Sequence, residues 1–206
     1  MQIIRHDRQN YPESMAEQEA MVADILAGRA TSTLIFTEHP PLYSIGTSGS
    51  EADVLTRNIN GESIAVYPSG RGGEVTYHGP GQLICYLLAD LRKDQDLHAH
   101  VHRLEEMIIR TLADFDIEAG RSSRGIGVWV EDKKIAAVGV RCRKWITFHG
   151  IALNIDPDLR HFSGIVPCGM SDAPVTSMRA LGSTADRNSV EQVIRHHSAI
   201  FSGPHR

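Results

Sequence analysis

Apolar residues recur at helical spacing in two segments of the chain, residues 11–29 and 98–117. In the first segment the spaced apolar residues are Met15, Val22, Ile25 and Leu26. Gly28 follows them and is a residue that can end a helix. In the second segment a single helical face carries Val101, Leu104, Ile108, Leu112 and Phe115. Both segments are therefore predicted to be amphipathic helices.

Runs rich in β-branched and aromatic residues predict strands over residues 32–46, 62–73 and 81–91. The first run is broken at Pro40 and Pro41, and the second ends in a glycine-rich loop. The third, "GQLICYLLADL", is apolar almost throughout, which is typical of a strand buried on both faces.

Residues 127–155 predict a hairpin and a following strand, with the turn at Glu131, Asp132 and Lys133. A hairpin requires antiparallel pairing, and the predicted strands outnumber the predicted helices. We therefore expect an α+β fold, with a mixed, largely antiparallel sheet flanked by helices. The chain of 206 residues is long enough for one sizeable core, so we expect one domain over residues 1–206.

Composition narrows the class of protein. The three cysteines lie far apart and form no C-x-x-C pair, which disfavours a disulfide framework and a zinc ribbon. The amino terminus lacks the apolar core of a signal peptide, and no apolar run approaches the roughly 20 residues that span a bilayer. The net charge of −4 argues against general affinity for nucleic acid. We expect a soluble, cytoplasmic protein that binds neither membrane nor nucleic acid.

Charge is concentrated in residues 121–144, which carry seven basic and two acidic side chains and so a net charge of +5. A solvated strand face explains this segment most simply. The other interpretation is a docking surface for an acidic partner.

A cysteine stands between a proline and a glycine in "GIVPCGM", residues 164–170. Pro167 fixes a backbone angle and Gly169 admits close approach of a ligand, so the motif predicts a rigid turn that presents the Cys168 side chain. Cys85, within the apolar run "LICYLL", is instead typical of a packed small hydrophobe. A cysteine placed by accident in a common Pro-X-Gly turn explains the motif about equally well.

The segment "RGGEVTYHGPGQ", residues 71–82, contains four glycines, a proline, a histidine and an arginine. Such a loop is entropically expensive to order, which favours a ligand-binding role over an elaborate turn. It is neither a P-loop nor a dinucleotide fingerprint. In a binding role, Arg71 and the N–H groups of Gly72 and Gly73 would be the polar contacts, and His78 would orient a group or polarise a carbonyl.

Lys134 opens a strand of small residues, Ala136 to Gly139, and a second small stretch runs from Gly150 to Ala152. A lysine at a strand end is normally a solvated charge. The small residues would leave a narrow apolar surface against which a linear apolar ligand could lie. Tight packing within the sheet explains them equally well.

Three histidines, His98, His100 and His102, open the second predicted helix. A metal site there is conceivable, but no H-E-x-x-H pattern or further ligand accompanies them. We interpret them as the solvated first turns of the helix and expect no metal.

Taken together, "RGGEVTYHGPGQ", "KIAAVGVRCRKWITFHGIALN" and "PCGM" resemble the three signature blocks of the lipoyl(octanoyl) transferases of lipoate biosynthesis, in the family order and with similar spacing. The resemblance is good over residues 65–180. It implies the fold of the biotin and lipoate protein ligase catalytic domain, and no cofactor. It also implies octanoyl-acyl carrier protein as the donor. The implied acceptors are lipoyl domains of 2-oxoacid dehydrogenase E2 subunits and the glycine cleavage H protein.

The resemblance also implies roles for individual residues. Cys168 matches the family nucleophile, which accepts the octanoyl chain as a thioester, and Lys134 matches the lysine that activates it. The residues that match substrate-contacting positions are Arg71, Gly72, Gly73, Glu74, Val75, Thr76, Tyr77, His78, Ala137, Val138, Gly139, Gly150, Ile151 and Ala152.

Two other functions remain open on the sequence. An ATP-dependent lipoate or biotin protein ligase would share the fold but release pyrophosphate and need no cysteine nucleophile. A non-catalytic module that binds an acyl carrier or a lipoyl domain would show binding without acyl transfer.

Overall fold

A mixed sheet of seven strands forms the centre of the computed structural model, which describes residues 1–166 and 174–201. Its strands are β1 (Gln2–Arg5), β2 (Thr33–Thr37), β8 (Gln82–Asp90), β9 (Gly120–Ser122), β10 (Gly125–Val130), β11 (Lys133–Arg143) and β12 (Ile146–Asn154). Their spatial order is β1-β2-β8-β12-β11-β10-β9. Within this sheet, as far as the structure describes it, only β1 and β2 pair in parallel, so the predicted mixed, largely antiparallel sheet is confirmed.

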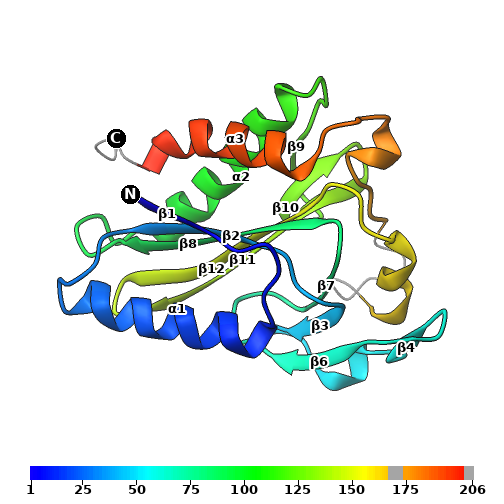
Figure 1. Cartoon of the computed structure of the whole chain (residues 1–206), viewed down its shortest axis with the longest axis horizontal. Coiled ribbons are helices and arrows are strands. Elements are labelled where there is room, and N and C mark those ends of the chain that lie inside the picture. The colour runs from blue at the N-terminus through cyan, green and yellow to red at the C-terminus, as the bar shows by residue number, and fades with distance from the viewer. Residues whose placement is uncertain (167–173, 202–206) are drawn as a thin grey trace.

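Helices cover both faces of this sheet (Figure 1). One face packs against α1 (Tyr11–Leu26), and the other against α2 (Leu97–Ala113) and α3 (Arg187–His197). Side chains cap two of the helices, because Asp96 accepts a hydrogen bond from Ala99 N and Asp186 accepts one from Ser189 N. The α+β architecture inferred from the sequence is therefore confirmed.

A smaller sheet stands beside the main one, and one of its strands, Val75–His78, lies within the segment 71–82 that was predicted to be a loop. It consists of β6 (Ala65–Pro68), β3 (Leu42–Ile45) and β7 (Val75–His78), in that order. The short hairpin of β4 (Asn58–Ile59) and β5 (Glu62–Ser63) lies near it in Figure 1. The short 3₁₀ helices are η1 (Glu51–Asp53), η2 (Leu159–Gly164), η4 (Arg179–Leu181) and η5 (Ser198–Phe201).

Two details of the second predicted helix are corrected. The helix ends at Ala113 and not at 117, because the chain turns at Asp116, which has a positive φ of 58°. His100 is fully buried, not solvated, and its Nε2 lies 3.3 Å from Thr147 Oγ1. His98 and His102 are exposed as expected.

The core lies on both sides of the central strands β8 and β12, whose side chains contribute to separate clusters under α2 with α3 and under α1. Cys85 belongs to the first cluster, and its burial raises the pKa of the thiol, as expected of a packed and unreactive cysteine. Among the helices of the described residues, none is long and apolar enough to cross a membrane.

Candidate active site

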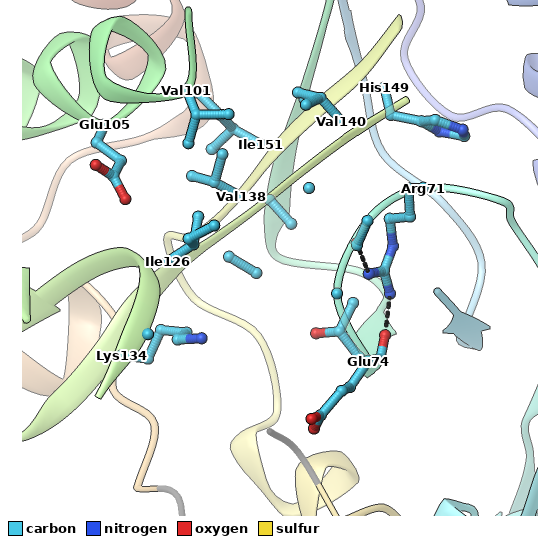
Figure 2. Close-up of a pocket in the computed structure, with 18 of the residues that line it drawn as sticks. Arg71, Glu74, Val101, Glu105, Ile126, Lys134, Val138, Val140, His149 and Ile151 are labelled. Carbon is cyan, nitrogen blue, oxygen red and sulfur yellow. Dashed lines mark hydrogen bonds between the residues drawn. The ribbon is translucent and has the colours of Figure 1, made fainter. Parts of the chain in front are cut away.

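A cavity of about 580 Å³ opens where β10 diverges from β11. The two strands pair only from Val128 with Ala136 to Val130 with Lys133, and a bulge lies between Val128 and Trp129. Residues 137–140 of β11 line the cavity together with residues of β12, α2 and the glycine-rich loop. Figure 2 shows Lys134 and Ile126 on one side of the cavity and Arg71 with Glu74 on the opposite side.

The structure brings most of the predicted contact residues to this one cavity. Those that line it are Arg71, Gly72, Gly73, Glu74, Val75, Thr76, His78, Ala137, Val138, Gly139, Gly150, Ile151 and Ala152, together with Lys134. Tyr77 does not line the cavity in the part of the chain that the structure describes. Its ring stacks on His161, with centroids 4.8 Å apart, on the face of β7 opposite to Thr76 and His78.

Arg71 shapes the glycine-rich loop from within. Its guanidinium donates hydrogen bonds to the carbonyl oxygens of Ser44 at 2.8 Å, Gly72 at 3.0 Å and Glu74 at 2.9 Å. Figure 2 shows the contact between Arg71 and Glu74. The Gly72 N–H, which we expected to contact a ligand, instead donates to Val140 O at 2.9 Å. The reason is that the edge of β11 offers a carbonyl at this point, so the loop is attached to the sheet.

His78 is a buried, neutral group of the cavity wall. Its Nε2 lies 3.0 Å from Ser44 Oγ. Burial, reinforced by His39 and Arg71, holds the pKa of His78 well below its usual range. A neutral imidazole can still donate a hydrogen bond to a carbonyl group, but it brings no positive charge.

Lys134 lies half-buried at the start of β11, and its side chain is held on two sides. The ammonium nitrogen is 4.8 Å from the centroid of the Trp129 ring, within range of a cation–π interaction. A Cβ added at Gly127 would lie 3.2 Å from Lys134 Cε, so the glycine leaves room for the lysine stem. Lys134 N donates to Pro174 O at 2.9 Å.

The small residues of β11 and β12 permit close packing and also line the cavity, which are the two roles that the sequence left open. Gly139 and Gly150 are paired across β11 and β12. A Cβ at Gly150 would lie 2.2 Å from Cys85 O, and one at Gly139 would lie 3.0 Å from Gly72 O, so both positions permit close packing. Their neighbours Ala137, Val138 and Ile151 line the cavity and give it an apolar wall.

Some of the cavity wall is polar and buried, and it comes from α1, β8 and β12. Tyr11, Gln82, Tyr86 and His149 all contribute to it. Burial lowers the pKa of His149 to about 4, with Arg71 and Arg141 as further causes. The cavity thus combines an apolar surface with neutral hydrogen-bonding groups.

The predicted nucleophile and the expectation of no metal both stay predictions. Cys168 lies outside the described residues, as does Gly169. Among the residues that the structure describes, no group of three His, Cys, Asp or Glu side chains could hold a metal ion.

The chain matches the model of the lipoyl protein ligase A/B catalytic domain over residues 10–201. It belongs to this family. It is 48% identical over 202 residues to an octanoyltransferase of Rhodospirillum rubrum, and the match covers 95% of this chain and 91% of the relative. The relatives found among curated proteins are acyltransferases by name, and this chain is an enzyme of that class.

Solved structures share the fold at low sequence identity. A lipoate-protein ligase A bound with ATP matches with a TM-score of 0.79 at 18% identity, covering 98% of this chain and 86% of the other. A bipartite lipoate protein ligase from Thermoplasma acidophilum matches with a TM-score of 0.78 at 17% identity, covering 98% and 83%. These likenesses establish the fold of the family member described here.

Helix α2 contributes cavity residues that sequence reasoning missed. Leu97, Val101 and Glu105 follow one another at helical spacing and line the cavity, as does Ile126 of β10. Glu105 is buried, accepting from Gly127 N and Arg121 Nε, both at 2.9 Å. The signal in the sequence was a carboxylate within the apolar stripe of the helix.

The basic side chains of residues 121–144 do not form one continuous cationic face. Arg121 pairs with Glu105 and Glu106 of α2, and Arg141 and Arg143 pair with Glu19 of α1. Lys133 and Arg124 are exposed near the end of β11 that carries Lys134. A docking surface for an acidic partner near Lys134 would therefore rest on Lys133 and Arg124, because Lys144 is exposed at the other end of β11.

Proposed function

We propose that the protein transfers an octanoyl group from octanoyl-acyl carrier protein to a lysine of a lipoyl domain. The acceptors are lipoyl domains of 2-oxoacid dehydrogenase E2 subunits and the glycine cleavage H protein. The observation that carries the proposal is the 48% identity to an octanoyltransferase across nearly the whole of both chains. The cavity supports it, because an apolar wall of Val138, Ile151 and Val101 suits a linear acyl chain.

Cys168 is the nucleophile of this proposal and Lys134 its proton partner. Pro174 follows Cys168 closely in the chain, and its carbonyl oxygen accepts from Lys134 N, which supports the pairing. A thiol and an amine that share one proton can exist as thiol with amine or as thiolate with ammonium, and either state supplies a nucleophile.

In the first step the Cys168 sulfur attacks the thioester carbonyl of the donor. The bond from that carbonyl carbon to the carrier sulfur breaks, and the carrier thiolate takes the proton held by Lys134. In the second step the amine of the target lysine attacks the Cys168 thioester, Lys134 takes its proton, and Cys168 leaves as thiolate. Thioester exchange is nearly balanced in free energy, and formation of the amide is downhill, so the sequence of steps needs no ATP.

The substitution Lys134→Arg tests this mechanism. Arginine keeps the positive charge but cannot give up its proton, so octanoyl transfer to a lipoyl domain should be nearly abolished. Lys133→Arg is the matched control, because Lys133 is the exposed neighbour on the same strand and should retain full turnover. Unchanged turnover in Lys134→Arg would show that the dyad is assigned wrongly.

A second candidate is an ATP-dependent ligase, which is favoured by the fold shared with a lipoate-protein ligase A bound with ATP. A ligase would act on free octanoate or lipoate and release pyrophosphate. Pyrophosphate release with free acid, and no transfer from the acyl carrier, would replace the proposed function with this one.

A further inference from the structure

Buried side chains form two sets of hydrogen bonds along the cavity wall, and the first set starts at Arg71. The guanidinium donates to Ser44 Oγ from Nη2 at 2.9 Å and from Nε at 3.3 Å. The hydroxyl oxygen is therefore an acceptor toward Arg71, and its own hydrogen is directed to His78 Nε2 at 3.0 Å. A neutral His78 whose Nε2 accepts carries its hydrogen on Nδ1, on the side of the ring away from Ser44.

A second set of hydrogen bonds runs through two side-chain amides. Gln82 Nε2 donates to Asn154 Oδ1 at 2.8 Å, and Asn154 Nδ2 donates to Thr176 O at 2.9 Å. Neither His78 Nδ1 nor Gln82 Oε1 has a hydrogen-bond partner among the described residues, so these bonds are separate from those of Arg71, Ser44 and His78. Gln82, Asn154 and Thr176 are all buried.

The second set of hydrogen bonds reaches the backbone beside Lys134. Thr176 N donates to Lys134 O at 3.0 Å, while Lys134 N donates to Pro174 O at 2.9 Å. The segment from Pro174 to Thr176 therefore lies alongside Lys134 as a short parallel bridge, on the opposite edge from β10. Asn154 Nδ2 donates to Thr176 O, and Thr176 N donates to Lys134 O, so Asn154 is linked to Lys134 through the backbone of one residue.

We propose that Gln82 and Asn154 are positioning residues for Lys134, acting through the backbone of Thr176. The proposal rests on the proposed function of Lys134 in proton transfer. Buried side-chain amides are costly unless they are hydrogen-bonded, so the pair is fixed in one orientation. Because that orientation fixes Thr176, it also fixes where the strand start at Lys134 places the ammonium group over Trp129.

The substitution Asn154→Asp separates the two links of this residue. An aspartate has the same size and can still accept from Gln82, but it has no N–H for Thr176 O and places an oxygen against it. Hydrogen exchange of the Lys134 and Thr176 amides, followed by NMR, should become at least tenfold faster. The Gly72 amide, which donates to Val140 O, should exchange at its original rate.

Thr111→Val is the matched control for loss of a buried bond from a side chain to the backbone. Thr111 Oγ1 donates to Met107 O at 2.8 Å within α2, away from the cavity. It should lower stability to a similar degree without changing exchange at Lys134. Gln82→Met serves if Asn154→Asp does not fold, and should speed the same two amides by a smaller factor.

Turnover provides the second measurement. A displaced Lys134 should lower kcat by a factor of up to about 100, with KM for the octanoyl-carrier unchanged, since misplacement of a catalytic group by about 1 Å has effects of that order. Unchanged exchange at Lys134 and Thr176, or equal changes in Thr111→Val, would overturn the proposal. The exchange measurement does not depend on catalysis, so failure of the proposed function would appear separately, as full turnover in Lys134→Arg.

Discussion

The Arg71 side chain stabilises the conformation of the glycine-rich loop to which it belongs. Arginine in a ligand-binding loop is commonly interpreted as a contact for substrate, yet Arg71 donates hydrogen bonds to the carbonyl oxygens of Ser44, Gly72 and Glu74. Its planar group of fixed donors suits this task, which a lysine could not perform. The conformation of the loop therefore depends on the hydrogen bonds that the Arg71 side chain donates.

Gly150→Ala tests whether close approach of two strands explains a glycine in the cavity wall. The added Cβ would lie 2.2 Å from Cys85 O, a backbone atom of the central strand β8 that cannot move aside easily. Overpacking of this kind costs about 1–3 kcal/mol, so the free energy of unfolding in urea should fall by that amount. Gly120→Ala is the control, because a Cβ there meets nothing within 4 Å. Equal stability of the two variants would contradict this explanation.

At the scale of elements, long segments rich in apolar residues were predicted well, and short or mostly polar segments were not. The apolar stripes of α1 and α2 and the apolar run of β8 are long, and each forms the predicted element. Helix α3 was not predicted because it is rich in charged and histidine residues, with only Val190 and Ile194 as buried apolar residues. Strand β1 was missed because four residues carry too little pattern.

The candidate site was also predicted only in part from the sequence. The loop 71–78 and the small residues of β11 and β12 were identified from motifs that are contiguous in sequence. Gln82 and Asn154 were not, because their hydrogen bond joins positions 72 residues apart and only the pairing of β8 with β12 brings them together. Contacts set by sheet register cannot be predicted from local spacing.

For the whole molecule, buried neutral histidines should make stability depend on pH. Burial is the main cause that lowers the pKa of His39, His100 and His149 from 6.5 to about 4 in each case. As pH falls below 6.5 the unfolded chain binds these protons first, so the stability present above 6.5 is lost progressively down to about 4. Each histidine lowers the free energy of unfolding by up to about 1.4 kcal/mol per pH unit in that window.

Urea unfolding at about pH 7, 6 and 5 measures this effect across the window in which the unfolded chain takes up protons. His100→Gln should reduce the slope by the share of one histidine, while His98→Gln, at an exposed position of the same helix, should leave it unchanged. A free energy of unfolding that stays constant over this range would show that these side chains are not held neutral.

An octanoyl thioester on Cys168 is the central claim of the proposed mechanism, and intact-protein mass spectrometry after mixing with octanoyl-acyl carrier protein tests it most directly. We expect an octanoyl adduct that hydroxylamine removes from the wild-type protein. In a parallel Cys168→Ser sample, this hydroxylamine-sensitive adduct should be absent. With a carrier confirmed to be loaded, no adduct on the wild-type protein, or the same adduct on the serine variant, would contradict the claim.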